Sequence, residues 1–189
     1  MRHSHGPGKG VDNPHAELHC GAKWSIIPCH GWPGAQIHLL FFTGTSEHSI
    51  DTKQRLAIPA KYRNQWSKEE DGDAWFCIPW PTGVLLLFTE NAFRQMARQR
   101  PATLTPNKAQ AELQARLFGY AERLEMDAAG RIVIPRKHMD RARLGTEVMI
   151  VGANTRLEVW DKGRWEAGDK EGFEKMADLV SEIERSPAQ

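Results

Sequence analysis

Two acid–base pairs with identical spacing occur in this sequence. Asp51 is followed four residues later by Arg55, and Asp127 is followed four residues later by Arg131. The second pair lies 76 residues after the first, and an Ile-Pro step follows both pairs at the same distance. A carboxylate beside a guanidinium can hold a turn together, and the guanidinium nitrogens that remain free can bind an anion or a polar base edge.

Paired aspartates also suggest acid–base catalysis, in which two carboxylates share one proton across a pseudo-two-fold axis. The neighbouring residues argue against it, because Asp51-Thr52-Lys53 and Asp127-Ala128-Ala129 differ from the Asp-Thr-Gly sequence that brings such carboxylates together. An arginine four residues later would also keep each aspartate ionised. We therefore expect no catalytic residue and no enzymatic activity. A small barrel enzyme using both aspartates stays as an alternative, to be tested by Asp→Asn substitution.

The cysteines and histidines give little support for a nucleophile or a metal site. Cys77 lies in an apolar stretch and is predicted to be a core residue. A site built from His19, Cys20, Cys29 and His30 would lack the close Cys-x-x-Cys pairing of structural zinc ligands. Three sparse cysteines form no disulfide framework, which is typical of a reducing cytoplasm. We expect no metal and no cofactor.

Basic residues gather around both Asp–Arg pairs, although the formal net charge is only +1. In a structural interpretation each arginine simply pairs with its aspartate and locks the turn. In a functional interpretation the turns form two separate basic rims, which enter a DNA groove, bind guanine edges through Arg and neutralise phosphates through Lys. The residues alone leave both open. The clusters are Lys53, Arg55, Lys61 and Arg63 in the first copy, and Arg131, Arg136, Lys137, Arg141 and Arg143 in the second.

Each pair opens a short unit of local structure, which is clearest in the second copy. Asp127 and Gly130 suit the first and fourth positions of a type I turn. The β-branched run 131–134 favours a strand. Pro135 ends that strand by removing a backbone donor, and it suits the start of a helix over 136–143.

The first copy repeats this pattern with a strand over 55–58, then Pro59 and a helix over 60–66. Gln54 stands where Gly130 stands, so a left-handed turn would be strained there by about 1 kcal/mol, and the first turn can differ in shape. A hairpin then follows in each copy. The expected hairpin strands are 76–78 with 85–88, and 148–150 with 157–160.

The flanking segments differ from these two units in composition. The N-terminal residues are rich in Gly, Pro and His and have no period, which predicts a disordered extension, as a misplaced start codon would produce. Thr105 and Pro106 suit the start of a linking helix. The tail has an apolar stripe that predicts one helix packing on the body or on a neighbouring subunit. The expected division is 1–40 extension, 42–95 first repeat, 105–125 linking helix, 124–167 second repeat and 168–189 acidic tail.

One strand–helix–hairpin unit has too little sheet to bury its apolar face. Two units can interleave into one closed barrel that leaves no exposed edges. The expected fold is therefore α+β and rich in β-structure. No apolar run is long enough to span a bilayer, so we expect no membrane association. A non-catalytic barrel whose acidic tail recruits a protein partner is a second alternative.

Over residues 42–165 the sequence resembles the MraZ family, bacterial transcriptional regulators related to the AbrB-type swapped-hairpin DNA-binding proteins. Asp51-Thr52-Lys53-Gln54-Arg55-Leu56 and Asp127-Ala128-Ala129-Gly130-Arg131-Ile132, each followed by Ile-Pro, carry the resemblance. Further support comes from 147–152, 157–161 and the opening Phe42-Thr43-Gly44.

The resemblance implies two tandem AbrB-type half-units in a small swapped-hairpin, double-psi-like β-barrel with short helices, assembled into a ring-like homo-oligomer. It implies binding to short direct repeats in double-stranded promoter DNA of the protein's own division and cell-wall gene cluster, commonly as a repressor at the nucleoid. By position it places Lys53, Arg55 and Arg131 at the DNA, with Lys61, Arg136 and Lys137 as weaker phosphate contacts. Asp51, Asp127, Gly130, Pro59 and Pro135 would shape the turns. Gln54 and Ala129 depart from the family pattern of Gly and a basic residue.

Overall fold

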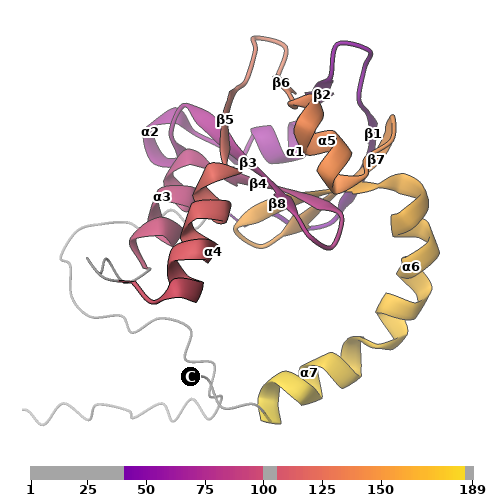
Figure 1. The fold of residues 1–189 in the computed structure, drawn as a ribbon. Coiled ribbons are helices and arrows are strands. Elements are labelled where there is room, and N and C mark those ends of the chain that lie inside the picture. Colours follow the sequence, from indigo (N-terminus) through magenta and orange to yellow (C-terminus); the bar gives the residue numbers. More distant parts are fainter. Residues whose placement is uncertain (1–40, 100–105, 186–189) are drawn as a thin grey trace, which may run out of the picture. The chain divides into compact units, whose positions relative to one another are not determined.

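A computed structural model describes residues 41–99 and 106–185, which form an α+β fold built on antiparallel sheet (Figure 1). Six strands follow the order β1-β7-β8-β4-β3-β5, and β2 pairs with β6 in a separate two-stranded ladder. The strands are β1 Thr45–Ser49, β2 Arg55–Ala57, β3 Ala74–Trp80, β4 Val84–Thr89, β5 Glu122–Glu125, β6 Arg131–Val133, β7 Glu147–Ala153 and β8 Arg156–Asp161. The helices are α1 Ala60–Arg63, α2 Lys68–Asp71, α3 Glu90–Arg98, α4 Lys108–Gly119, α5 Arg136–Ala142, α6 Lys162–Glu174 and α7 Met176–Arg185.

The strand pairing joins the two sequence repeats through exchanged partners. Strand β1 of the first repeat pairs with β7 of the second, and β5 of the second pairs with β3 of the first. The short ladder lies on the pseudo-two-fold axis, because Leu56 pairs with Ile132, its own equivalent in the other repeat. Neither repeat therefore completes its sheet from its own strands.

The expected closed barrel is wrong, because the ladder of the six-stranded sheet ends at β1 and β5 within the described residues. Strands β2 and β6 have three residues each, and Pro59 and Pro135 follow soon after and cap helices α1 and α5. A proline removes a ladder donor, so these strands cannot lengthen into partners for both edges. In the described residues, β2 is joined to the segment directly after β1 by an isolated bridge between Ile50 and Leu56 and by the Asp51 N–H, which donates to Arg55 O.

The main core lies between the six-stranded sheet and the short ladder. Phe42 and Tyr62 are fully buried and meet edge to face, with ring centroids 5.5 Å apart. Leu56 and Ile132 enter the same cluster from the ladder, because strand side chains alternate between the two faces. A second cluster forms under α3 and α4, where the rings of Phe76 and Phe93 stack at 4.4 Å.

The linking helix is shorter than the sequence predicts. It begins at Lys108 after Asn107, whose side chain accepts a hydrogen bond from Gln110 N–H in a reciprocal capping box. Thr105, the expected N-cap, lies outside the described residues. The helix ends at Gly119, and residues 122–125 form β5 instead, because pairing with β3 satisfies their backbone groups.

The acidic tail forms two consecutive helices where one was predicted. Asp161 caps α6 by accepting a hydrogen bond from Arg164 N–H, and α7 follows after Lys175. Neither helix has a buried residue, and within the described part of the chain only the start of α6 contacts the body, through Trp165 and Arg164. Packing of the tail on a neighbouring subunit stays a prediction. Figure 1 shows α6 leaving the sheet at the end of β8. Within the same part, no helix combines the length and apolar character needed to cross a bilayer.

Candidate nucleic-acid interface

The outer face of the β2–β6 ladder carries one arginine from each repeat. Arg55 pairs with Val133, and Ala57 pairs with Arg131, so the two arginines are diagonal neighbours on one face. Their side chains are 32% and 37% exposed, while Leu56 and Ile132 on the other face are fully buried. The first arginine of each predicted basic rim therefore lies on one shared surface, the outer face of the β2–β6 ladder, which we call the arginine face.

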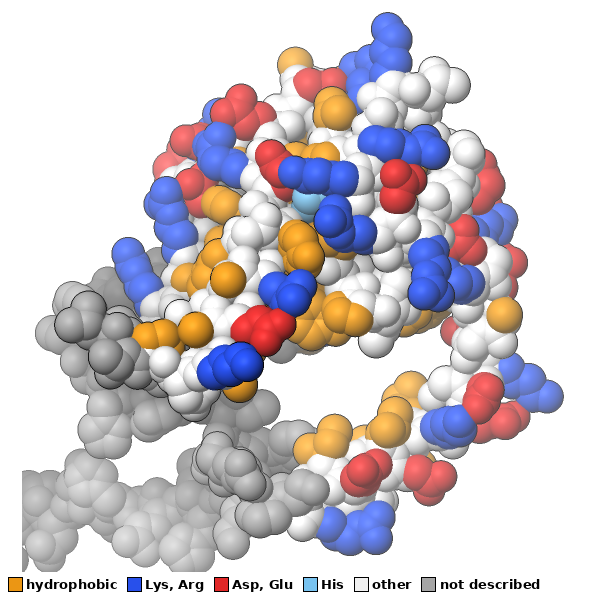
Figure 2. Space-filling view, viewed as in Figure 1, with side chains coloured by type: hydrophobic (Ala, Val, Ile, Leu, Met, Phe, Trp, Pro, Cys, Tyr) orange, Lys and Arg blue, Asp and Glu red, His pale blue; other side chains and the backbone are white. Residues whose placement is uncertain are grey.

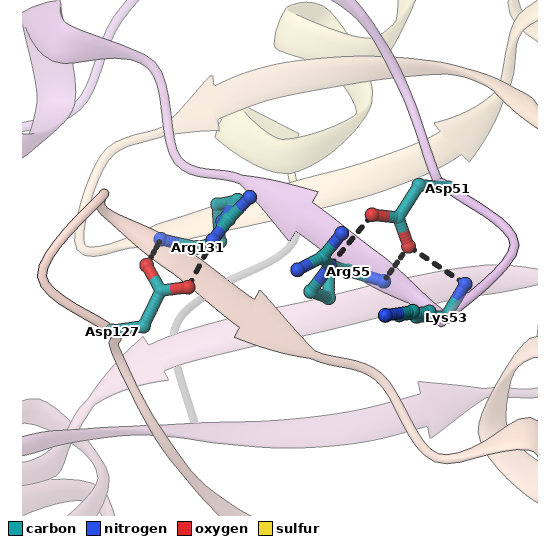
Figure 3. Close-up of polar contacts among 5 residues, drawn as sticks. All are labelled: Asp51, Lys53, Arg55, Asp127 and Arg131. Carbon is teal, nitrogen blue, oxygen red and sulfur yellow. Dashed lines mark hydrogen bonds and ion pairs between the residues drawn. The ribbon is translucent and has the colours of Figure 1, made fainter.

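Each arginine is held by the aspartate of its own turn (Figure 3). Asp51 Oδ1 accepts hydrogen bonds from the backbone N–H groups of Lys53 and Arg55, at 2.8 and 2.9 Å. Asp51 Oδ2 accepts from Arg55 Nε at 2.7 Å. One carboxylate therefore shapes the turn and orients the guanidinium that follows it.

The second turn has the same geometry. Asp127 Oδ1 accepts from the backbone N–H groups of Ala129 and Arg131, both at 2.9 Å, and Oδ2 accepts from Arg131 Nε at 2.9 Å. The Gly130 N–H also donates to Asp127 O at 2.8 Å, which confirms the predicted turn. Each arginine does pair with its aspartate and lock the turn, as the structural interpretation predicts, but only the Nε atom of each guanidinium takes part. In the described part of the chain, Nη1 and Nη2 of both arginines make no hydrogen bond.

The geometry does not suit a shared-proton pair of carboxylates. The two arginines lie between the two aspartates (Figure 3). The carboxylates therefore do not face each other, as a shared proton would require. The backbone N–H of Arg55 is the main cause that lowers the pKa of Asp51, and Arg131 N–H does the same for Asp127. A dyad of this kind needs one carboxyl whose pKa is raised. The arrangement therefore favours two ionised carboxylates that position arginines.

These lowered pKa values predict a loss of stability in acid. The folded pKa of each aspartate lies below its unfolded value of about 4, so the stabilisation is complete above that pH. It is lost as the pH falls through the folded pKa. We expect the urea midpoint to fall with decreasing pH more steeply in the native chain than in the double variant Asp51→Asn, Asp127→Asn. Equal slopes in the two proteins would contradict this assignment.

The turns also connect the two repeats through left-handed residues. Gln54 and Gly130 have φ values of 63° and 76°, so the two turns share one shape despite the different residue. Ile134 N–H donates to Gln54 O and Ile58 N–H donates to Gly130 O, each at 2.9 Å. Each turn therefore fixes the isoleucine that precedes the N-cap proline of the other repeat's helix.

Substitutions at these two positions should act in opposite directions on stability. Gln54→Gly removes a side chain from the left-handed region and should raise the free energy of unfolding by up to about 1 kcal/mol. Gly130→Ala should lower it by about 1–3 kcal/mol, because the new Cβ would meet the guanidinium of Arg63, with Cζ only 2.7 Å away. Urea unfolding followed by circular dichroism measures both. A destabilised Gln54→Gly protein would show that the glutamine side chain itself supports the turn.

The other residues predicted to contact DNA differ in whether their side chains already have an intramolecular partner. Lys53 is exposed at the tip of the first turn, and Ala129 occupies the matching place in the second. Lys61 Nζ donates to Thr45 O at 2.6 Å, and Lys137 pairs with Glu122 at 2.9 Å. Each lysine thus links its helix, α1 or α5, to the start of the first strand of its own repeat, β1 or β5.

Arg136 pairs with Asp140 one turn further along α5 at 3.1 Å, with 71% of its side chain exposed. Pro59 and Pro135 stand directly before α1 and α5, as expected from their fixed φ. The side chains of Lys61, Arg136 and Lys137 thus already have intramolecular partners, whereas the Lys53 ammonium group has none among the described residues.

Arg63 belongs to the first basic cluster, and the structure gives it a position that its sequence neighbours do not indicate. It lies against Gly130 of the other repeat's turn, and its Nε is buried without a hydrogen-bond partner among the described residues. Met139 stands at the equivalent position of the second repeat. The second turn therefore has a neighbouring guanidinium where it lacks a basic residue of its own. No local pattern could show this contact, because it joins positions 67 residues apart.

The structure supports no nucleophile or metal site in the part that it describes. Cys77 is fully buried, and burial raises the pKa of its thiol far above the ordinary range, which confirms it as a core residue. No cluster of three or more potential metal ligands occurs in 41–99 or 106–185. His19, Cys20, Cys29 and His30 lie outside these ranges.

Comparisons with known proteins divide the chain into two matching segments, as the sequence repeat does. Residues 41–114 and 117–178 match the family model described as "MraZ protein, putative antitoxin-like". A "Transcriptional regulator MraZ" of Coxiella burnetii (strain RSA 493 / Nine Mile phase I) is 33% identical over 146 residues, covering 75% of this chain and 96% of the relative. A protein of the same name from Pediococcus pentosaceus is 33% identical over 144 residues, with the same two shares. One from Yersinia enterocolitica is 33% identical over 124 residues, covering 66% of this chain and 82% of the relative.

Proposed function

The chain belongs to the MraZ family, and from this premise we propose that it is a sequence-specific DNA-binding regulator of transcription without enzymatic activity. The observation that carries the proposal is the arginine face. Arg55 and Arg131 lie side by side, each is fixed through Nε by an aspartate, and each has both terminal nitrogens free of partners in the described part. A pre-oriented guanidinium loses little side-chain freedom on binding, which favours a specific contact.

The spacing of these arginines suits one short stretch of major groove. Diagonal neighbours across an antiparallel ladder lie roughly 7–8 Å apart, or about two base-pair steps of 3.4 Å. Each guanidinium can donate two hydrogen bonds to O6 and N7 of guanine. Lys53 at the rim would neutralise a phosphate, with Lys61, Arg136 and Lys137 contributing at most weakly while their present partners hold them. We infer a recognition element of a few base pairs for each chain.

One such element is too short to select a promoter, and this supports an assembly that presents several of them. Linking several weak contacts raises the overall affinity without new contacts. We propose a ring-like homo-oligomer that binds direct repeats in the promoter of the protein's own division and cell-wall gene cluster and represses it, in the cytoplasm at the nucleoid. Its two units, 42–95 and 124–167, would be AbrB-type half-units of the swapped-hairpin kind, flanked by an extension, a linking helix and an acidic tail.

The test is an electrophoretic mobility shift with the DNA immediately upstream of the protein's own gene. We expect saturable binding that resists an excess of unrelated DNA and weakens linearly in log affinity against log salt. Scrambling the direct repeats at constant base composition is the matched control and should abolish the specific complex. Equal binding to native and scrambled DNA would overturn the proposal of sequence-specific regulation.

A further inference from the structure

Helix α7 carries an apolar stripe that nothing in the described part of the chain covers. Figure 2 shows these side chains along one side of the helix. Met176, Leu179, Val180 and Ile183 recur at helical spacing and are 54%, 53%, 44% and 71% exposed. An exposed stripe of this size on an amphipathic helix is typical of a surface that packs on a partner.

A matching apolar groove lies between α4 and the β3–β4 hairpin. Ile78 and Trp80 of β3 line one wall, and Leu113, Leu117 and Tyr120 line the other. Trp80 and Leu113 are 40% and 47% exposed, so the groove is open to a partner in the described part of the chain. A helix that inserts i, i+3, i+4 and i+7 side chains into such a groove is a common mode of recognition.

Charge also matches between the two surfaces. Arg116 and Arg141 flank the groove. Arg116 already pairs with Glu112 at 2.9 Å, whereas Arg141 lies over the ring of Tyr120 without a carboxylate partner among the described residues. Helix α7 has three acidic residues and one basic residue, a net charge of −2; they are Asp178, Glu182, Glu184 and Arg185. An acidic helix beside the unpaired Arg141 gains in attraction and in orientation.

The start of α6 fixes where α7 can go. Trp160 and Trp165 pack at 5.6 Å, and Arg164 donates to Ala142 O at 2.8 Å, so the first turn of α6 is held to the body. Lys175 N–H donates to Glu171 O and Leu179 N–H donates to Lys175 O, which keeps α6 and α7 connected by helical hydrogen bonds. The 13 residues of α6 form an arm of roughly 20 Å. No residue of α7 is buried in the described part of the chain, so its stripe is open to a second copy.

We propose that α7 of one copy docks into the groove between α4 and the β3–β4 hairpin of a second copy. Two different surfaces meet in this contact, so it is heterologous, and each copy can use both at once. Repetition of one heterologous contact closes into a ring when the rotation allows it. The inference rests on the homo-oligomer in the proposed function and specifies its interface.

The test uses two single substitutions and their mixture, measured by size-exclusion chromatography with light scattering. Ile183→Asp places a charge in the stripe, and Leu113→Asp places one in the groove. Both positions are exposed, so the fold should persist, which circular dichroism checks. Ser181→Asp and Ala115→Asp are matched controls that add the same charge outside the stripe and the groove.

We expect the native chain and both controls to assemble beyond a dimer, and each interface variant to fall to the mass of one chain. An equimolar mixture of the two variants should double that mass, because the intact stripe of one fits the intact groove of the other. A monomeric native chain, or variants that keep the native mass, would overturn the inference. An unaffected groove variant would mean that α7 pairs elsewhere and would overturn it too. DNA binding is measured separately, because the arginine face is untouched; a native assembly that ignores promoter DNA would reject the proposed function alone.

Discussion

Arg55→Ala and Arg131→Ala should each weaken binding to promoter DNA while the fold and the assembly persist. Each substitution removes one guanidinium whose terminal nitrogens are free in the described structure, and a good bidentate contact to guanine contributes about 1–3 kcal/mol, or roughly 5- to 150-fold in affinity. When several chains bind one promoter, the loss repeats at each of them. The double variant should therefore bind promoter DNA no better than unrelated DNA.

The measurement is a fluorescence anisotropy titration at fixed salt, with Arg98→Ala as the control. Arg98 is exposed at the end of α3, so its removal takes away one positive charge outside the arginine face. That control should bind almost as tightly as the native chain. Stability should change little in either arginine variant, because half-exposed ion pairs contribute about 0–1 kcal/mol. A large, equal loss of folding in both would show that the arginines serve the turns alone.

Phe42→Ala should destabilise the protein strongly, while the same change at Phe41 should do little. Phe42 is fully buried against Tyr62 and Trp75, with ring centroids at 5.5 and 5.9 Å. Truncation of a buried phenylalanine costs about 3–5 kcal/mol, which is a large part of the 5–15 kcal/mol that stabilises a typical domain.

The neighbouring residue gives a matched control from the same segment. Phe41 is 59% exposed, and its truncation should change the free energy of unfolding by no more than about 0.5 kcal/mol. Thermal and urea unfolding compare the two variants directly. Similar losses in both would mean that Phe41 is covered in solution, and a small loss at Phe42 would mean that the segment from 42 to 44 is not part of the core.

The local features of the site could be read from the sequence because neighbouring residues determine them. Alternation in Arg55-Leu56-Ala57 and Arg131-Ile132-Val133 places each arginine outward when the apolar middle residue points inward. The Asp-to-Gly turn and the breaks at the two prolines follow from backbone geometry in the same way.

The features that the sequence analysis missed or misjudged depend on partners far along the chain. Strand β1 has the polar sequence Thr-Ser-Glu-His-Ser, and pairing with β7 makes it a strand. Residues 122–125 carry helical spacing but pair with β3. The open sheet and the contact of Arg63 with the second turn also follow from tertiary packing, which a short window of sequence does not contain. Helices α2 and α3 were missed although each has a local N-cap, Ser67 and Thr89.

The exchange of first strands between the repeats has a consequence for a chain that is cut. Because β1 is paired with β7 and β5 with β3, a protease that cleaves between α3 and α4 would leave two fragments locked together by sheet. Neither fragment contains the partner strand for its own first strand, so each would behave as an obligate subunit of a heterodimer. The fused chain can be regarded as a dimer whose subunits cannot dissociate. Its two repeats can therefore diverge in sequence while the covalent link keeps them paired.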